Sequence, residues 1–321
     1  RAGTDGTPTL RVSSHNNSDT GTEVLTISST GTVTVGSLDI GHGLGSGGTA
    51  NTESTAVGLA ALDSSLHTSI RNTAIGAHTL TALNNANVGA YAGSSITSGA
   101  RNVAVGDAAL AGTDDGTYNT AVGQIALQAN CGDHNVGVGY NALNNFTGDN
   151  ATAVGSGAAD AAVNAISVTA VGYNAAGAVT SGNDSTAVGS NALGTCTTES
   201  GNTAVGSHAG FNVKGENNVM IGMQAGYYAD DIDHCIAIGR NAMLGVDGGT
   251  TDGDYNIAIG SYTLDAMTTG HSNVAVGHNA GTAMKTASQN VAIGSHALET
   301  EDHGSNTVAI GFHALYDQNV N

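Results

Sequence analysis

Small and β-branched residues alternate along most of this chain. From residue 51 onward one pattern recurs: Asn, a β-branched residue, Ala, Val or Ile, Gly, two variable residues, Ala, and then Leu or Gly. Clear copies are NTAIGAHTL (72–80), NVAVGDAAL (102–110), NTAVGQIAL (119–127), NTAVGSHAG (202–210), NVAVGHNAG (273–281) and NVAIGSHAL (290–298). The β-branched residues stand two positions apart, which is the period of a strand. Each copy therefore predicts one short β-strand that ends at a glycine turn.

The glycine that ends each strand, here called the marker glycine, sets the register of the repeat and occurs 16 times. The marker glycines are Gly58, Gly76, Gly89, Gly106, Gly123, Gly139, Gly155, Gly172, Gly189, Gly206, Gly222, Gly239, Gly260, Gly277, Gly294 and Gly311. Their intervals are 18, 13, 17, 17, 16, 16, 17, 17, 17, 16, 17, 21, 17, 17 and 17 residues. Such near-constant spacing predicts a repeat architecture.

The columns of the repeat differ in residue size. The position before the marker glycine is Val or Ile in all 16 copies, and two places earlier it is Thr, Val or Ile in 15. Between them Ala occurs in 13 copies, and three residues after the glycine Ala occurs in 14. The exceptions to the three incomplete columns are Ala86; Asn87, Gly137 and Met220; and Thr79 and Thr263. The strand is thus predicted to have one β-branched face and one very small face.

The repeat predicts an all-β fold, a parallel β-solenoid or trimeric β-helix-like fibre built from about 17-residue coils. A helix is disfavoured because each interior glycine would cost about 1 kcal/mol. One strand of four to five residues and a shorter second segment would make one coil, and coils must stack to bury their apolar faces. Sixteen coils at roughly 4.8 Å each would make a rod on the order of 75–80 Å long.

Two domains are expected. Residues 51–321 form the solenoid repeat domain of about 16 coils, and residues 1–50 form a strand-rich shaft or adaptor segment without the repeat. Within that segment TLRVSS (9–14), EVLTISS (23–29) and TVTVGSLDI (32–40) are interpreted as short strands joined by turns, and GHGLGSGG (41–48) as a joint.

The direction in which each strand face points bears on assembly. The β-branched face is expected inside the coil, which leaves the alanine face outward. An outward face so small predicts close packing against two identical chains about a three-fold axis; the alternative is that Ala fits a narrow coil interior. Val205→Asp is expected to damage folding in either arrangement, and Ala204→Glu is expected to block assembly if the alanine face meets sister chains.

Composition and charge exclude several classes of protein. The chain has 48 Gly, 1 Pro and no Trp, and its 26 Asp and Glu outnumber its 7 Lys and Arg to give a net charge of −19. Such an acidic surface repels nucleic acid and anionic lipid. No apolar run approaches the roughly 20 residues that a transmembrane helix needs. Neither nucleic-acid binding nor membrane insertion is expected, and the fixed spacing of Val and Ile argues against disorder.

The NTAVG and NVAIG repeats, with the Ala and the Leu or Gly that follow, carry a family resemblance over residues 51–315. They resemble the head repeats of YadA-like trimeric autotransporter adhesins. They are even more similar to repeat regions of bacteriophage tail-fibre proteins, notably those that end in a self-cleaving intramolecular chaperone domain. The interval here is longer than in adhesin heads, and no coiled-coil heptads are present.

The resemblance to phage fibres implies a structural homotrimeric tail fibre of the virion, which projects toward the host and supports receptor binding. Its implied partners are two identical chains, other virion tail proteins and a host cell-surface receptor, glycan or protein. The alternative is the head of a trimeric adhesin on a bacterial surface.

Candidate chemistry is sparse, and no catalytic, cofactor-binding or metal-binding residue is assigned. His78, His208, His296 and His313 each stand two residues after a marker glycine, where a trimer would be able to gather imidazoles around a metal ion. Because other copies hold many residue types there, a solvated or capping role is favoured. The loop with Asp247, Asp252 and Asp254 has oxygen ligands for calcium, but it lacks a calcium-loop pattern and is interpreted as a surface loop.

The remaining classes are disfavoured on specific residues. Cys131, Cys196 and Cys235 are far apart and indicate neither a disulfide framework nor a zinc site. An enzyme is not expected, because the carboxylates are scattered and few aromatic residues are present to stack on sugar rings. An ice-binding solenoid would show outward Thr arrays, whereas Thr120 and Thr203 alternate with Val103 and Val274 in a column interpreted as interior.

Overall fold

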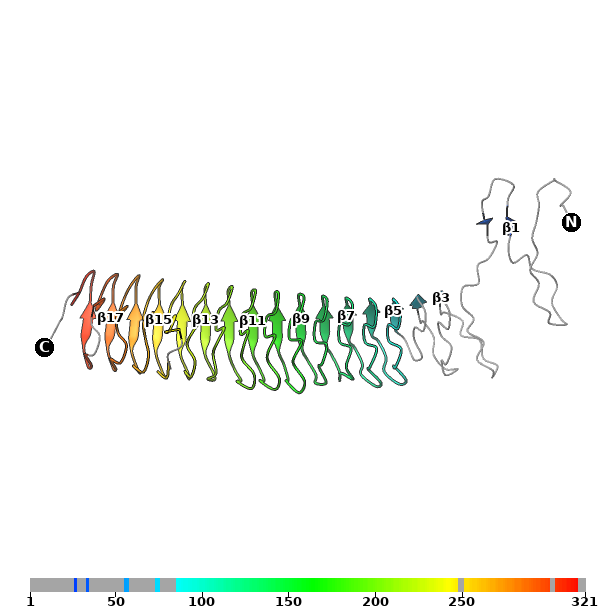
Figure 1. Ribbon diagram of the computed structural model, residues 1–321, viewed down its shortest axis with the longest axis horizontal. Coiled ribbons are helices and arrows are strands. Elements are labelled where there is room, and N and C mark those ends of the chain that lie inside the picture. Colours follow the sequence, from blue (N-terminus) through cyan, green and yellow to red (C-terminus); the bar gives the residue numbers. More distant parts are fainter. Residues whose placement is uncertain are drawn as a thin grey trace.

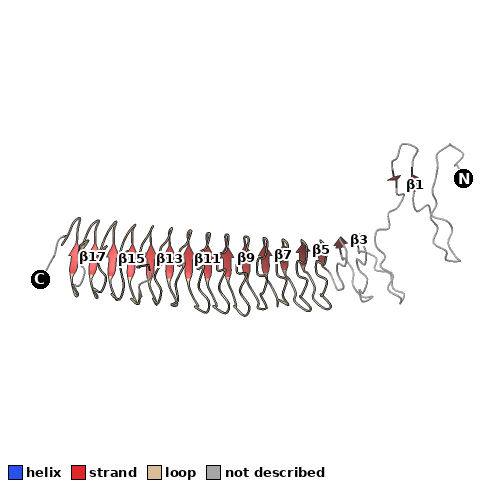
Figure 2. Cartoon of the chain, viewed as in Figure 1, coloured by secondary structure: helices blue, strands red, loops and turns tan. Residues whose placement is uncertain are grey.

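The computed structural model describes residues 85–247, 251–300 and 304–316, together with short strands at residues 26–27, 33–34, 55–57 and 73–75. These residues form strands and turns, and no helix occurs among them. Strands line one side of each coil, and turns make up the rest (Figure 2). The predicted all-β class is confirmed.

The strands of the repeat are three residues long. The elements are β1 (Thr26–Ile27), β2 (Val33–Thr34), β3 (Thr55–Val57), β4 (Thr73–Ile75), β5 (Ala86–Val88), β6 (Val103–Val105), β7 (Thr120–Val122), β8 (Val136–Val138), β9 (Thr152–Val154), β10 (Thr169–Val171), β11 (Thr186–Val188), β12 (Thr203–Val205), β13 (Val219–Ile221), β14 (Ile236–Ile238), β15 (Ile257–Ile259), β16 (Val274–Val276), β17 (Val291–Ile293) and β18 (Val308–Ile310).

Strands β3 to β18 form one 16-stranded sheet in which each strand pairs in parallel with the strand of the next coil (Figure 1). The columns stay in line along the rod, so that Ala204 of β12 lies opposite Ala187 of β11 and Met220 of β13. The 21-residue interval leaves the register unchanged, since Ile236 pairs with Ile257. The predicted parallel β-solenoid with coils of about 17 residues is confirmed.

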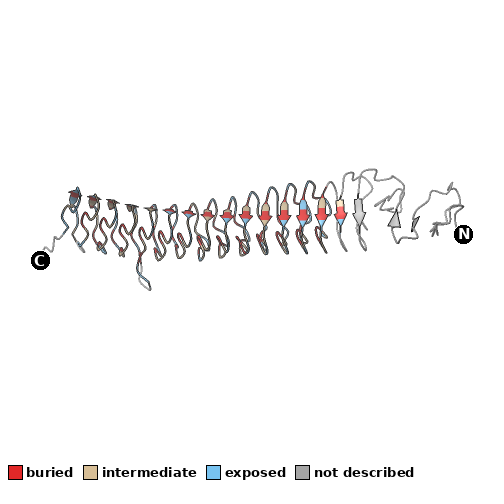
Figure 3. Cartoon of the chain, turned by 90° about the horizontal axis from the view of Figure 1, so that it is seen from above, coloured by how far each residue is buried: buried red, intermediate tan, exposed pale blue. Residues whose placement is uncertain are grey.

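The predicted shorter second segment of each coil consists of turns and is not a strand. After the marker glycine the chain follows a series of turns, and Tyr228 and Gly245 form an isolated parallel bridge there. Backbone hydrogen bonds still link these turns from coil to coil, as from the Leu110 N–H to the Ala126 carbonyl at 3.1 Å. The strands therefore lie along one side of the rod, as Figure 3 shows.

The prediction that the β-branched face lies inside the coil and the alanine face outside is wrong. Ala204 is fully buried within its own chain, whereas Val205 keeps 36% of its surface exposed. The same order recurs along the sheet, because the middle residue of every strand from β4 to β18 is buried and its neighbours are partly or fully exposed. The alternative, that Ala fits a narrow coil interior, agrees with the structure.

The narrowness of the interior explains this order. The inner face of each strand packs close to the alanine three residues after the marker glycine, and Ala209 in that column is also fully buried. The next residue, often Leu, fills the remaining space, as Leu193 does. Interiors are packed to crystal-like density, so a β-branched residue in place of each inner alanine would overfill the coil.

One exception to the alanine column, Met220, shows how the interior volume is kept. Met220 replaces the inner alanine where the space-filling residue of its own coil is Gly226 and that of the preceding coil is Gly210. A Cβ on Gly226 would lie 2.5 Å from the Met220 sulfur, and one on Gly210 would lie 3.0 Å from it. A large residue on one wall is thus compensated by glycine on the other, which keeps the interior volume constant.

The marker glycine is required for two reasons. Gly206 has a φ of +139°, a conformation that L side chains rarely adopt. A Cβ at this position would also lie 2.6 Å from the carbonyl oxygen of Gly222 in the next coil. Successive coils therefore approach each other closely along the marker column, which agrees with the predicted glycine turn.

Three further positions in each complete coil from Gly89 onward have positive φ without being reserved for glycine, and two of them lie in the turns directly after the marker glycine. In the coil that starts at Gly123 these are Ile125 and Leu127, with φ values of 52° and 48°. The conformation is unfavourable for both residue types. It is stabilised by hydrogen bonds to neighbouring coils, which the Ile125 N–H donates to the Asp107 carbonyl at 2.8 Å and the Leu127 N–H to the Ala142 carbonyl at 3.0 Å.

The asparagine that opens the repeat forms a buried ladder between coils. The Asn119 side-chain oxygen accepts from the Asn135 backbone N–H at 2.8 Å, and its Nδ2 donates to the Gly132 carbonyl at 2.7 Å. The Asn119 N–H in turn donates to the side-chain oxygen of Asn102 at 2.8 Å. The ladder satisfies backbone groups at the point where the chain enters each strand, which explains the asparagine column.

Little of the N-terminal segment is described. Strands β1 and β2 form an antiparallel pair that falls within the predicted strands at 23–29 and 32–40. The predicted strand at 9–14 and the joint at 41–48 lie outside the described residues. The division at residue 50 stays a prediction.

Candidate functional site

The outward face of the sheet carries a continuous band of β-branched side chains, which we call the outer strip. It consists of the first and third residues of strands β5 to β18. Ala86 is the one member of this set that is neither Thr, Val nor Ile, and no charged residue occurs in these strands. Within the sheet, Val105 and Ile259 each keep 38% of their surface exposed. The outer strip is therefore an uncharged and largely apolar surface.

The size of the outer strip makes it a candidate interaction surface. Fourteen strands at about 4.8 Å spacing and a width of roughly 10 Å give an area on the order of 600 Å². The largest apolar patch on a typical soluble monomer covers about 300–600 Å² and is often functional. The outer strip reaches the upper end of that range as one unbroken band, which favours burial against another surface.

The threonines of the outer strip face outward. Thr120, Thr203, Val103 and Val274 lie on the outward side, so the prediction that this column is interior is wrong. The location of this column is therefore no reason to exclude an ice-binding surface. An ice-binding surface is still disfavoured because the column is irregular: four consecutive threonines in β9 to β12 are flanked by Val136 and Val219, and the other strands begin with Val, Ile, Ala or Thr.

Ring side chains border the outer strip at several coils. On the edge where the chain enters the strands, Tyr118 stacks on His134 with ring centroids 4.8 Å apart, and the Arg101 guanidinium lies 5.0 Å from the Tyr118 ring. On the edge where the chain leaves the strands, Tyr140 and Tyr173 are 55% and 58% exposed. Exposed aromatic and arginine side chains beside an apolar band are typical of protein interfaces.

The histidines two residues after the marker glycine lie at a corner of the coil. His208, His296 and His313 all have positive φ, and His78 lies outside the described residues. The His296 Nδ1 contacts the Glu299 carboxylate at 2.6 Å, and its ring lies 4.8 Å from that of His313. In the part of the chain that the structure describes, no group of three or more His, Cys, Asp or Glu lies together as metal ligands would.

The aspartates of the predicted surface loop are separated in their roles. Residues 248–250 lie outside the described residues. Asp254 Oδ1 accepts a hydrogen bond from the Asp233 N–H of the preceding coil at 2.9 Å. Asp254 therefore links coils, and the calcium alternative gains no support from it.

The three cysteines are buried free thiols in the coil interior. Cys235 takes an asparagine position of the ladder, where the Asn218 oxygen accepts from its N–H at 2.9 Å. Burial raises the pKa of Cys131 to about 11 and that of Cys235 to about 12. Such buried thiols are unreactive.

In comparisons with protein-family models, curated proteins and solved structures, no match to this chain was found. Among the described residues, no helix has the length and apolarity needed to cross a bilayer.

The sequence shows the residues of the outer strip but does not show that they face outward. The signal of the outer strip is the strict Val or Ile before each marker glycine, which the sequence shows in every copy. Alternation alone gives two faces without saying which one is inside. The signal that would have decided is the second alanine column, since two small columns in one coil indicate two walls in contact.

Proposed function

We propose that this chain is the repeat region of a structural homotrimeric fibre, most consistent with a phage tail fibre that supports attachment to a host cell. The outer strip is the observation that carries the proposal. An apolar band this long has to be covered by a surface of the same length and regularity. A second and a third copy of the same chain provide such surfaces, because each copy carries the same repeat.

The composition of the outer strip suits self-association. Its strands carry no charge, while the net charge of −19 belongs to residues elsewhere in the chain. Three identical strips that meet at an axis would thus bury β-branched side chains without bringing like charges together. The acidic residues would remain on the outside of the fibre, where they favour solubility.

The three-fold number rests on the resemblance of the NTAVG and NVAIG repeats to trimeric fibre and adhesin repeats. A bacterial surface adhesin head is the alternative, and it would use the outer strip in the same way. The other virion proteins and the host receptor are proposed on the same resemblance.

The mass of the full chain in solution tests the assembly. Sedimentation velocity and light scattering are expected to give an elongated particle of three times 31.5 kDa. The double variant Val171→Asp/Val205→Asp places two charges on the outer strip and is expected to shift the mass toward the monomer while the β signal in circular dichroism is kept.

A matched control adds the same charge elsewhere. Ser181 and Thr198 are exposed residues outside the strands. The double variant Ser181→Asp/Thr198→Asp is expected to keep the mass of the parent. A monomeric parent would contradict the proposal, and a dimer would keep the outer strip as an interface but contradict the three-fold fibre.

A further inference from the structure

The turns that follow the marker glycines form a lateral face of the rod, distinct from the outer strip. We define it by the residues two and five positions after each marker glycine. From Gly106 to Gly189 these positions hold no aromatic ring or histidine: they are Ala108, Ala111, Ile125, Gln128, Asn141, Asn144, Gly157, Asp160, Asn174, Gly177, Asn191 and Gly194. From Gly206 onward rings recur on the lateral face. The C-terminal coils are therefore chemically different from the coils that start at Gly106 to Gly189.

The first ring cluster of the lateral face lies over Gly194. A Cβ on Gly194 would be 2.6 Å from the Phe211 ring, which shows that the ring covers this glycine. Phe211 stacks on Tyr227 with centroids 5.1 Å apart, and His208 lies 5.6 Å from Phe211. These half-buried rings form an aromatic platform on the surface.

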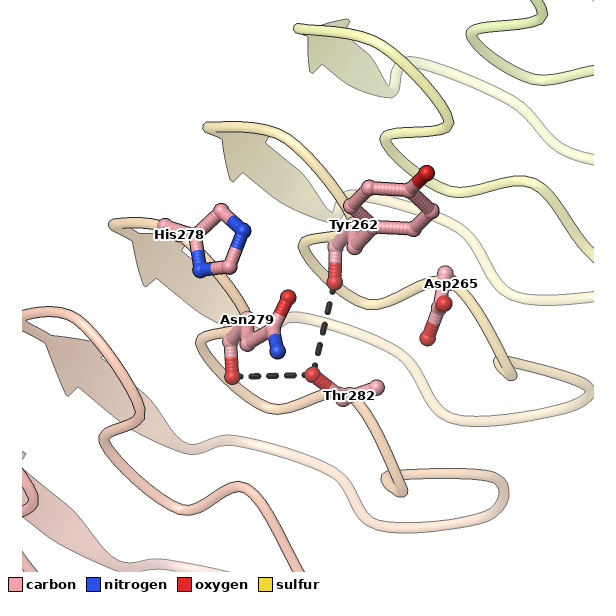
Figure 4. A pocket seen from close by; sticks show the side chains of 5 residues that line it. All are labelled: Tyr262, Asp265, His278, Asn279 and Thr282. Carbon is pink, nitrogen blue, oxygen red and sulfur yellow. Dashed lines mark hydrogen bonds between the residues drawn. The ribbon is translucent and has the colours of Figure 1, made fainter.

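Two coils beyond the coil that carries Tyr227, the lateral face contains a pocket of about 270 Å³. It is lined by Tyr262, Asp265, His278, Asn279 and Thr282 from two adjacent coils (Figure 4). Tyr262 and His278 lie edge to face, 6.2 Å apart, and the Thr282 hydroxyl donates to the Asn279 carbonyl at 2.8 Å. The pocket thus combines an aromatic ring with a carboxylate, an amide, an imidazole and a hydroxyl.

Asp265 in this pocket lacks a contact that carboxylates at the same position have in other coils. Asn141 Nδ2 donates to Asp160 Oδ2 at 2.9 Å, and Asn279 Nδ2 donates to Glu299 Oε1 at 3.2 Å. In both pairs the amide belongs to the preceding coil. Asp265 Oδ1 is buried without a hydrogen-bond partner, and so is the Oδ1 of Asn241, the residue at the amide position of the preceding coil.

The coil that carries Asp265 has the usual 17 residues, but the coil that precedes it has 21. Asn241 and Asp265 are therefore further apart in sequence than the paired residues in the other coils. A buried oxygen without a donor is unfavourable by about 1–3 kcal/mol. The Asp265 carboxylate, which lines the pocket, therefore has unused capacity to accept a hydrogen bond.

We infer that the pocket binds a sugar residue of a neutral saccharide. A sugar hydroxyl would donate to the Asp265 carboxylate where it lines the pocket, and the Tyr262 ring would pack against an apolar face of the sugar ring. The pocket is smaller than the roughly 300–1,000 Å³ of drug-sized sites, which suits one residue of a longer glycan chain. The Phe211 and Tyr227 platform lies in line along the rod and offers a second place for the same chain.

Charge selects among saccharides. An anionic sugar would meet the Asp265 carboxylate and a chain with net charge −19. A neutral sugar meets no such repulsion and supplies the hydroxyl donors that the carboxylate needs. The inference deepens the proposed attachment role, because it specifies one class of receptor, but the pocket itself is built from a single chain.

The test uses the full chain on an array of neutral, sialylated and sulfated oligosaccharides, followed by calorimetric titration with the best neutral binder. Binding to neutral saccharides is expected. Asp265→Ala and Tyr262→Ala are each expected to weaken the affinity by at least about tenfold, the loss of one charge-assisted hydrogen bond or one ring contact. The melting midpoint of each variant shows whether it is folded, and Asp265→Asn serves as the gentler second variant.

Two controls and the particle mass complete the test. Asp160→Ala removes a carboxylate from the same column of another coil, and Tyr173→Ala removes an exposed ring elsewhere; neither should change the affinity. Three results would overturn the inference: binding confined to anionic saccharides, no binding at all, or affinities of the folded Asp265→Ala and Tyr262→Ala variants that equal the affinity of the parent. A trimer without saccharide binding would contradict the saccharide site alone, and saccharide binding by a monomer would contradict the trimeric assembly alone.

Discussion

The inner and outer faces of the same three-residue strands sort their residues by size. On the inner face Ala187 and Ala204 are fully buried, and on the outer face Val171 and Val205 each remain 36% exposed. Hydrophobicity alone would place valine inside before alanine. In this coil the two walls lie too close together for that order, so the larger apolar residues are left outside. Each face therefore has its own role, the inner one in coil packing and the outer one in the proposed association of chains.

The largest expected effect comes from charges placed on either face of β12. Ala204→Glu puts a carboxylate into the closed coil interior and is expected to cost more than about 4 kcal/mol, enough to unfold the adjacent coils. Val205→Asp should leave the coils folded. Far-UV circular dichroism and urea denaturation compare the two variants. Loss of β structure in Val205→Asp together with a folded Ala204→Glu would contradict the assignment of the faces.

A methyl group on the marker glycine tests how closely the coils stack. Gly206→Ala introduces a Cβ 2.6 Å from the Gly222 carbonyl oxygen, and about 3 kcal/mol of destabilisation is expected from this clash and from the positive φ. Gly311 has a φ of +128° but no atom within 4 Å of the added Cβ. Gly311→Ala should therefore cost less in thermal denaturation, and equal losses would mean that backbone conformation alone requires the glycine.

Removal of one rung of the asparagine ladder should have a smaller effect. Asn119→Ala deletes the side-chain bonds to the Gly132 carbonyl and the Asn135 N–H and leaves both groups buried. A loss of about 2–4 kcal/mol is expected. Asn145→Ala removes one exposed bond to the Asp160 carbonyl and should cost less than about 0.5 kcal/mol. If urea denaturation gave both variants the same small loss, the ladder would not be a main contributor to stability.

The smallest expected effect concerns Asp265 and depends on pH. Burial raises the pKa of this carboxyl from 3.8 to about 6. Well below pH 3.8 the group is protonated in both states; as the pH rises from there to about 6 the unfolded chain ionises first, and the native state loses stability. Asp265→Asn should therefore stabilise the protein at neutral pH by about 1 kcal/mol, a value reduced for partial exposure, and should have little effect near pH 3.5. Thermal melts at both pH values measure this difference, and a destabilised variant at neutral pH would contradict it.

The sequence was sufficient for the architecture because the repeat is strict. A marker glycine in every coil and a strand before it predict the parallel solenoid, and the register of the pairs confirms it. Which face of the strand is buried was not predictable from alternation, because alternation defines two faces without saying which one lies inside. Nor was the conformation of Ile125 and Leu127, because positive φ is unfavourable for both and arises from hydrogen bonds to other coils.

The site features were harder to predict than the fold. Asparagine opens most repeats, but its role as a ladder depends on contacts about 17 residues apart that exist only once the coils are stacked. Likewise the pocket joins Tyr262 and Asp265 to His278 of the next coil, and the unpartnered Asp265 oxygen lies in the coil after the one long interval. Such features depend on departures from the repeat, which a consensus pattern hides.

Solvent access to the outer strip tests the central claim most directly. Val205→Cys and Thr198→Cys place one new thiol on the outer strip and one on an exposed turn, and the three native thiols are buried. Maleimide labelling of the native chain is followed by mass spectrometry, with urea-unfolded protein as the reference. Rapid labelling is predicted for the new thiol of Thr198→Cys, and strong protection from labelling is predicted for the new thiol of Val205→Cys. Equal labelling rates at the two positions in the native protein would contradict the outer strip as an interface between chains.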